Sequence, residues 1–149
     1  MSTVDTASET TLSIRRTYPV ARERVFKAWL DPDTLRRFLG PTDVSLAELD
    51  ADPRIGGTYR IVMNTPNGAW TVRGTYIEIR EPERIVFTWA WDEDDPAAVI
   101  ESLVTLDFTE RDGGTELTLT HAQLRDADSR DGHARGWTSI LEKLEGVLA

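Results

Sequence analysis

The chain has 149 residues, no cysteine and a formal net charge of −9 at pH 7, with a pI of about 4.7. This length suits one domain, and the missing cysteines exclude disulfides, thiolate metal sites and cysteine nucleophiles. The negative charge repels phosphate backbones and disfavours nucleic acid as a partner. Every apolar run falls short of the roughly 20 residues that span a bilayer, so we expect no membrane insertion and, with no cysteine, a cytoplasmic location.

Residues 1–10 are polar and acidic, with neither a basic start nor an apolar stretch. This pattern predicts a disordered N-terminus instead of a signal peptide, followed by one domain over residues 11–149. Apolar and polar residues alternate over residues 11–18, which predicts a half-buried strand. Over residues 21–30 the apolar residues recur at helical spacing, which predicts a short amphipathic helix. Asp31 and Pro32 then open a second short helix, as an N-cap and a proline at the first helical position.

From residue 44 to residue 122 the sequence alternates strand patterns with turn residues. The predicted strands cover residues 44–50, 58–64, 70–79, 85–91, 99–110 and 115–122. Short glycine, proline, asparagine and aspartate clusters separate most of them, which indicates hairpins in an antiparallel meander. An acidic loop over residues 92–96 is the longest interruption.

The C-terminal segment, from about residue 133 to 148, carries one apolar stripe. Trp137, Leu141, Leu144 and Leu148 follow one another at steps of four, three and four residues, as on one face of a helix. No other segment is long enough to cover a wide sheet face. The sequence therefore predicts an α+β helix-grip fold, in which a curved antiparallel sheet of six to seven strands surrounds a long C-terminal helix, with two short helices after the first strand.

Five short motifs, in order, resemble one known superfamily. They are RERVFKAW leading into Asp31-Pro32, GGTY at 56–59, GTYIEI at 74–79, EPERIVFTW at 81–89, and Gly136-Trp137. Together they resemble the START-like (SRPBCC) superfamily, in the branch of the activators of heat-shock protein 90 ATPase. The resemblance covers the chain from Leu12 onward and implies the helix-grip fold, with a space between sheet and helix that holds lipids, polyketides or hormones in some members. The eukaryotic activators engage the chaperone through a separate N-terminal domain, so the resemblance does not transfer that role.

Strand alternation predicts which side chains face the space between sheet and helix. Each member of this set can instead be ordinary core, and an empty cavity of about 400 Å³ would cost on the order of 10 kcal/mol, so aromatic rings that fill the space are an alternative to a ligand. The predicted ligand-binding residues are Tyr59, Ile61, Met63, Trp70, Tyr76, Phe87, Trp89, Trp91, His121, Trp137 and Leu141.

His121 ends a predicted strand and can be a general base, a ligand donor or a hydrogen-bonded structural histidine. His133 falls in a polar loop or a first helical turn. The two histidines lie on separate elements without metal-ligand spacing, so we expect no metal, no cofactor and no assigned catalytic residue. Glu78 and Glu101 interrupt apolar strands, and a solvent face or an arginine partner such as Arg73 is the simpler interpretation.

Three hypotheses for function follow. The leading one is a non-enzymatic domain that binds a small apolar or aromatic molecule between sheet and helix. The second is a cyclase- or hydrolase-like enzyme that uses the same cavity, with His121, Glu101 or Tyr76 as acid or base. The third is a chaperone-associated interaction domain that works through the outer sheet surface. Both a monomer and a homodimer are compatible with the sequence.

Overall fold

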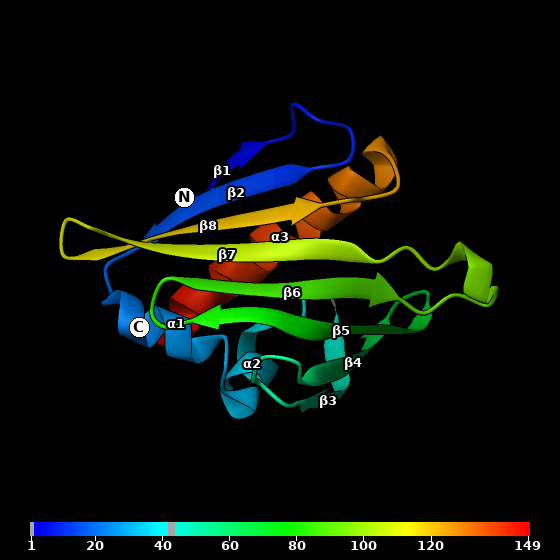
Figure 1. Cartoon of the computed structure of the whole chain (residues 1–149), viewed down its shortest axis with the longest axis horizontal. Coiled ribbons are helices and arrows are strands. Elements are labelled where there is room, and N and C mark those ends of the chain that lie inside the picture. The colour runs from blue at the N-terminus through cyan, green and yellow to red at the C-terminus, as the bar shows by residue number, and fades with distance from the viewer. Residues whose placement is uncertain (1, 42–43) are drawn as a thin grey trace.

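The computed structural model describes residues 2–41 and 44–149, and over these residues the chain forms one eight-stranded antiparallel sheet, three α-helices and one 3₁₀ helix (Figure 1). The strand order is β1-β2-β8-β7-β6-β5-β4-β3. The elements are β1 (Ser2–Asp5), β2 (Leu12–Tyr18), α1 (Arg22–Ala28), α2 (Pro32–Phe38), β3 (Ser45–Ala51), β4 (Thr58–Thr65), β5 (Gly68–Arg80), β6 (Arg84–Trp91), η1 (Pro96–Ala98), β7 (Ser102–Arg111), β8 (Gly114–Ala122) and α3 (Ala127–Leu148).

Strands β3 to β8 form the predicted meander, and turn residues set the connections. Between β7 and β8, Asp112 and Gly113 both have positive φ, at 52° and 79°, as a tight hairpin turn of the type I′ class requires. Strand β2 then pairs with β8, from Leu12 opposite His121 to Tyr18 opposite Thr115. The early strand is thereby joined to the last one, and α1 and α2 lie in the connection between β2 and β3.

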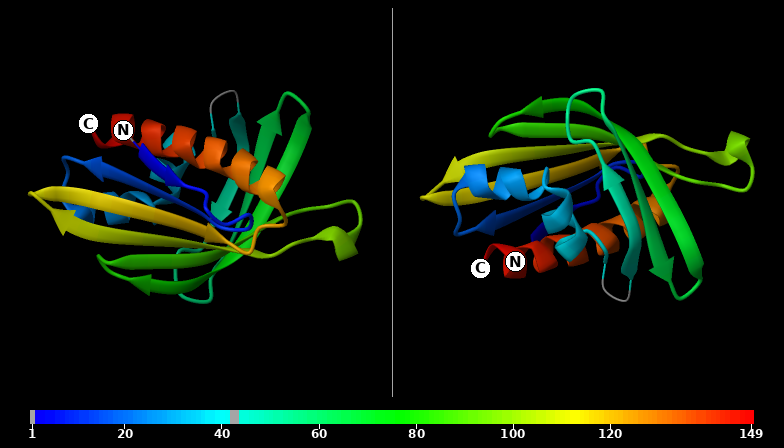
Figure 2. Two further views of the ribbon diagram at one scale, coloured as in Figure 1. Left: turned by 90° about the horizontal axis from the view of Figure 1, so that it is seen from above. Right: turned by 90° about the horizontal axis from the view of Figure 1, so that it is seen from below.

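Helix α3 lies on the concave side of the bent sheet, as Figure 2 shows from above and below. The predicted stripe is buried: Trp137, Leu141, Leu144 and Leu148 are each at most 4% exposed. Polar contacts fix the helix at both sides. Arg16 of β2 donates to Glu145 at 3.1 Å, and the Lys143 ammonium donates to the carbonyl of Gly40 after α2. The predicted helix-grip architecture is confirmed.

One buried hydrogen bond joins the sheet directly to the helix backbone. The hydroxyl of Tyr18, on β2, donates to the carbonyl oxygen of Leu141 at 2.8 Å. Burial raises the pKa of Tyr18 well above its ordinary value, so the hydroxyl stays protonated as a donor.

We expect Tyr18→Phe to lower the free energy of unfolding by about 1–2 kcal/mol, because it leaves the Leu141 carbonyl buried without this donor. Urea denaturation measures the change. Tyr76→Phe is the matched control, since the Tyr76 hydroxyl makes no hydrogen bond to another described residue. Equal losses in both variants would contradict a role for the Tyr18 bond.

The largest differences from the sequence prediction are at two places, and β7 also begins at Ser102 instead of residue 99. Residues 1–10 are expected to be disordered, yet Ser2–Asp5 form β1, an eighth strand where six to seven are predicted; Met1 lies outside the described residues. This edge strand pairs with β2 through backbone bonds and shows no apolar alternation, so its sequence gives no strand signal. Helix α3 begins at Ala127 instead of about residue 133, because Asp126 caps it by accepting from the Ser129 N–H at 2.8 Å.

In the two described ranges, no helix has both the length and the apolar character needed to cross a membrane.

Candidate functional site

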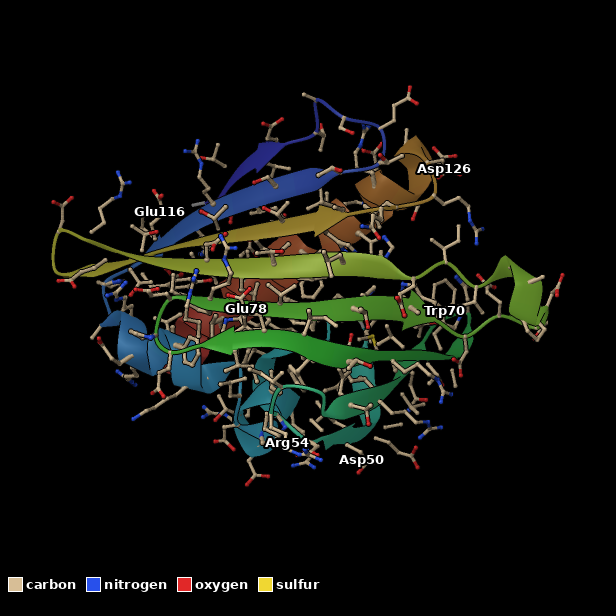
Figure 3. All side chains as sticks on the ribbon, in the orientation of Figure 1. Asp50, Arg54, Trp70, Glu78, Glu116 and Asp126 are labelled. Carbon is tan, nitrogen blue, oxygen red and sulfur yellow. The ribbon has the colours of Figure 1, made fainter. Side chains whose placement is uncertain are left out.

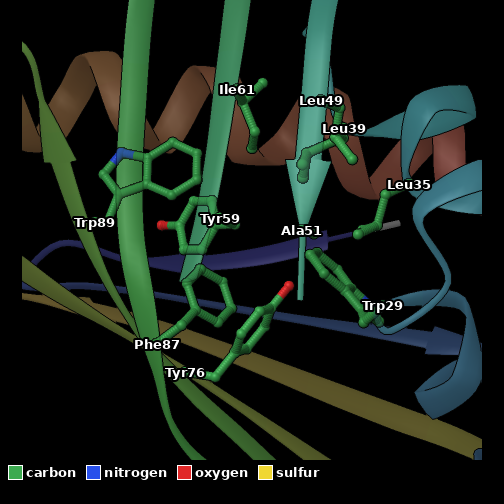
Figure 4. A pocket seen from close by; sticks show the side chains of 10 residues that line it. All are labelled: Trp29, Leu35, Leu39, Leu49, Ala51, Tyr59, Ile61, Tyr76, Phe87 and Trp89. Atoms are coloured by element: carbon green, nitrogen blue, oxygen red, sulfur yellow. The ribbon is translucent and has the colours of Figure 1, made fainter. Parts of the chain in front are cut away.

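Aromatic side chains fill most of the interior between the sheet and the short helices. The cavity that remains there has about 30 Å³, and its ten lining residues are labelled in Figure 4. They are hydrocarbon and aromatic side chains from the residue that follows α1, from the region of α2, and from strands β3 to β6. A space of this size holds about one water molecule and offers it few polar partners. This inner void is therefore too small for an organic ligand.

Tyr59 illustrates how tightly this interior is packed. Its ring meets Phe87 edge-on, with centroids 5.8 Å apart, and its buried hydroxyl donates to the backbone carbonyl of Thr88. Burial raises the pKa of Tyr59 well above its ordinary value. A Cβ atom added at Gly74 would lie 2.6 Å from the Tyr59 ring, so glycine is needed for this close approach. The rings around the inner void are held by their neighbours.

A much larger groove lies between the first half of α3, the adjoining ends of β4, β5 and β6, and the β6–β7 loop. Its volume is about 1030 Å³. Four tryptophans line it, and their rings are in contact: Trp70 with Trp91 at 5.9 Å between centroids, Trp91 with Trp89 at 5.6 Å, and Trp89 with Trp137 at 4.9 Å. Trp70 is 50% exposed, whereas Trp89 and Trp137 are almost fully buried. An aromatic surface thus extends from the core to the solvent.

His121 lies beneath this surface with both ring nitrogens in hydrogen bonds. Its Nδ1 accepts from the indole N–H of Trp137 at 2.9 Å, which assigns the proton of the neutral ring to Nε2. Nε2 lies 2.7 Å from Ser102 Oγ, and that hydroxyl donates to the Trp89 carbonyl at 2.7 Å. Burial lowers the pKa of His121 well below its ordinary value, and nearby His133 adds to the shift. The ring is neutral, fully paired and 0% exposed.

His133 is also neutral but lines the groove. Its Nδ1 donates to the Ser129 carbonyl at 2.7 Å, one helical turn earlier, and its Nε2 accepts from the indole N–H of Trp91 at 2.9 Å. Burial lowers the pKa of His133, although the bond to Ser129 opposes that shift. The two histidine rings meet at 4.8 Å between centroids. Each histidine thus orients one tryptophan of the groove.

The charged residues around the space lie at its edge or on the outside, as the solvent-face interpretation of Glu78 and Glu101 expects. Asp92 lines the groove and pairs with Arg73, and this hydrogen-bonded arginine lowers the pKa of Asp92. Glu78 lies 3.7 Å from Arg80, not beside Arg73, and Glu101 is exposed. Within residues 2–41 and 44–149, no group of three or more His, Asp or Glu side chains could hold a metal ion.

The comparison with known proteins identifies the chain's family. Residues 19–149 match the family model described as "Activator of Hsp90 ATPase homolog 1-like protein". The chain belongs to this family. The AHSA1-like chain is similar to solved structures from Chromobacterium violaceum (26% identity, TM-score 0.85, 93% of this chain and 96% of that one) and Rhodobacter sphaeroides (26%, 0.84, 99% and 97%). It is also similar to the AHSA1 protein from Silicibacter pomeroyi (31%, 0.78, 91% and 95%), whereas no curated protein is significantly similar in sequence.

The AHSA1-like fold divides the predicted ligand-binding residues into three groups. Groove residues are Met63, Trp70, Trp89, Trp91 and Trp137; Trp89 also borders the inner void, together with Tyr59, Ile61, Tyr76 and Phe87. His121 and Leu141 border neither space and are 0% exposed. A strand's alternation gives the face of each side chain but not its position along the strand relative to α3, so the sequence could not separate these groups.

Sequence reasoning missed several groove residues, among them Ser102 and Ser129. The sequence predicts His133 only in a polar loop or a first helical turn, whereas it lines the groove. The available signal was the N-cap at Asp126, because a helix that starts at Ala127 brings His133 into its second turn, one turn before Trp137.

Proposed function

We propose that this AHSA1-like protein is a binding domain that holds a small apolar or aromatic molecule in the groove over Trp70, Trp91, Trp89 and Trp137. The observation that carries the proposal is a groove of about 1030 Å³ with four contacting tryptophans. Ligand sites in proteins have roughly this size and are lined mainly by apolar and aromatic side chains with a few placed polar groups. The inner void, at about 30 Å³, leaves the groove as the space for a ligand.

The hydrogen bonds of the histidines favour binding over acid-base catalysis. A general base needs a free nitrogen within reach of a substrate, and both nitrogens of His121 are already bonded to Trp137 and Ser102. The Nε2 of His133 accepts from Trp91. Tyr76 is buried at the inner void and Glu101 is exposed outside the groove lining, so the three residues of the enzymatic alternative do not converge. The groove is better suited to binding a ligand by shape and aromatic contact than to acid-base catalysis.

We expect Trp70→Ala to weaken binding of a neutral aromatic probe, N-phenyl-1-naphthylamine, by about tenfold. Trp70 is 50% exposed, so its removal takes away groove wall at little cost to folding, and tryptophan contacts of this kind commonly dominate binding energy. The enhanced emission of the bound probe measures the affinity in a titration.

Ile77→Ala is the matched control, because Ile77 is 51% exposed and lies outside the groove lining. It should bind the probe like the wild type. Wild-type protein that leaves the probe emission unchanged, or a Trp70→Ala protein that binds it equally well, would remove the support for the groove as the site.

A further inference from the structure

The charge around the groove is strongly one-sided. Among its lining residues in the described ranges are five acids, Asp92, Glu93, Asp94, Asp126 and Asp128, and one arginine, Arg125. Asp92 pairs with Arg73, at 2.8 Å and 2.5 Å between their atoms, and Glu93 lies 3.6 Å from Arg125. Two of the five acids are thus paired with an arginine, and three acids remain without an arginine partner among the described residues.

The three remaining acids differ in what they do locally. Asp126 accepts from the Ser129 N–H at the start of α3 and so has a structural role there. Asp94, in the β6–β7 loop, and Asp128, in the first turn of α3, have no ion pair or hydrogen bond through their side chains to any part of the chain that the structure describes. Two separate segments thus bring unneutralised carboxylates to the same groove. We therefore expect a ligand in the groove to meet a negative electrostatic potential.

The aromatic part of the groove lies at the same end of the molecule as this charge. Figure 3 places Trp70 and Asp126 toward one end of the long axis, with Glu116 toward the other. Trp70 and Trp91 meet at an interplanar angle of 79°, so their faces form a corner. The face of a tryptophan ring attracts ammonium groups, and tryptophan does so more strongly than the other aromatic residues. Asp94, Asp128, Trp70 and Trp91 all line this one groove, so the carboxylates and the aromatic faces act on the same ligand.

From these observations we infer that the groove takes a cationic aromatic or apolar amine, with its ammonium group near Trp70 and Trp91 and inside the field of Asp94 and Asp128. This inference rests on the proposed function of the groove as a ligand site and names the class of ligand. The same carboxylates act against anionic ligands of equal shape.

The test compares a cationic and a neutral probe of nearly the same shape, and adds an anion that is larger by one carboxylate group. Phenyltrimethylammonium and tert-butylbenzene have nearly the same shape, because a quaternary nitrogen replaces a quaternary carbon, and 4-tert-butylbenzoate supplies an anion. Titrations are followed by the NMR signals of the tryptophan indole N–H groups. We expect the cation to bind about tenfold more tightly than the neutral probe, the anion to bind most weakly, and the preference to shrink in 1 M salt.

Two double variants that lose the same amount of negative charge test whether the groove carboxylates cause the preference for the cation. Asp94→Asn with Asp128→Asn should reduce the preference for the cation by about threefold or more. Asp50→Asn with Glu142→Gln is the control, because both residues are exposed, unpaired to any other described residue and absent from the groove lining. It should keep the wild-type preference.

The outcomes separate the two proposals. If the neutral probe shifts the groove indole signals and the cation binds no better, the groove binds ligands but the inference is wrong. A cation preference that both double variants reduce equally would reflect net charge alone and would also overturn it. If no probe shifts any indole signal up to its solubility limit, the proposed function fails as well.

Discussion

Replacing Trp137 with alanine is expected to lower the free energy of unfolding by about 3–5 kcal/mol, a large part of the 5–15 kcal/mol typical of a whole domain. Trp137 is 2% exposed and contacts the rings of Trp89, Trp29 and His121. Its loss leaves a cavity between sheet and helix. It also removes the hydrogen-bond donor to His121 Nδ1, so a buried acceptor loses its partner.

Trp137→Phe divides this loss into packing and hydrogen bonding. Phenylalanine keeps part of the aromatic contact with Trp89 but cannot donate to His121, so we expect a loss of about 1–3 kcal/mol. Denaturation by urea, followed by circular dichroism, measures both variants. A Trp137→Ala protein within 1 kcal/mol of the wild type would mean that the core closes without this side chain, against the central position that the contacts give it.

Most of the fold could be predicted because most of its elements leave a local signature. The steps between Trp137, Leu141, Leu144 and Leu148 mark a helix face, and the Asp112-Gly113 pair marks a hairpin. The sequence carries no such signature where backbone or capping hydrogen bonds determine an element. Strand β1 has only Val4 as a large apolar residue, and it forms because the edge of β2 offers unpaired backbone groups.

The site could be predicted only to the level of which strands and faces contribute. Alternation correctly brings Trp89 and Trp91 to the side of α3, yet it cannot show that Tyr59 and Phe87 close the inner void while Trp70 borders an open groove. Hydrogen bonds such as that between Trp91 and His133 join residues 42 positions apart. Such pairs depend on where the helix lies across the sheet, which no local pattern of residues specifies.

The two neutral histidines should make the protein less stable in mild acid. In the unfolded chain both rings take up a proton near pH 6.5, whereas burial keeps the pKa of His121, and to a smaller degree that of His133, below that value in the folded protein. The unfolded state therefore binds more protons below pH 6.5. Stability that is fully present at pH 7 and above is lost as the pH falls from about 6.5 toward the folded pKa values.

The expected slope is up to about 1.4 kcal/mol per pH unit for His121, with a smaller contribution of the same sign from His133, because its bond to Ser129 opposes the shift. Urea denaturation at pH 7, 6 and 5 measures it. Asp92, whose lowered pKa stabilises the fold with the same sign, acts only below about pH 4 and leaves this window clear. His121→Gln should lower stability at every pH but flatten the slope, whereas His133→Gln should flatten it less. A wild-type profile that is level from pH 7 to 5 would mean that His121 takes up its proton in the folded state, which its bonds to Trp137 and Ser102 oppose.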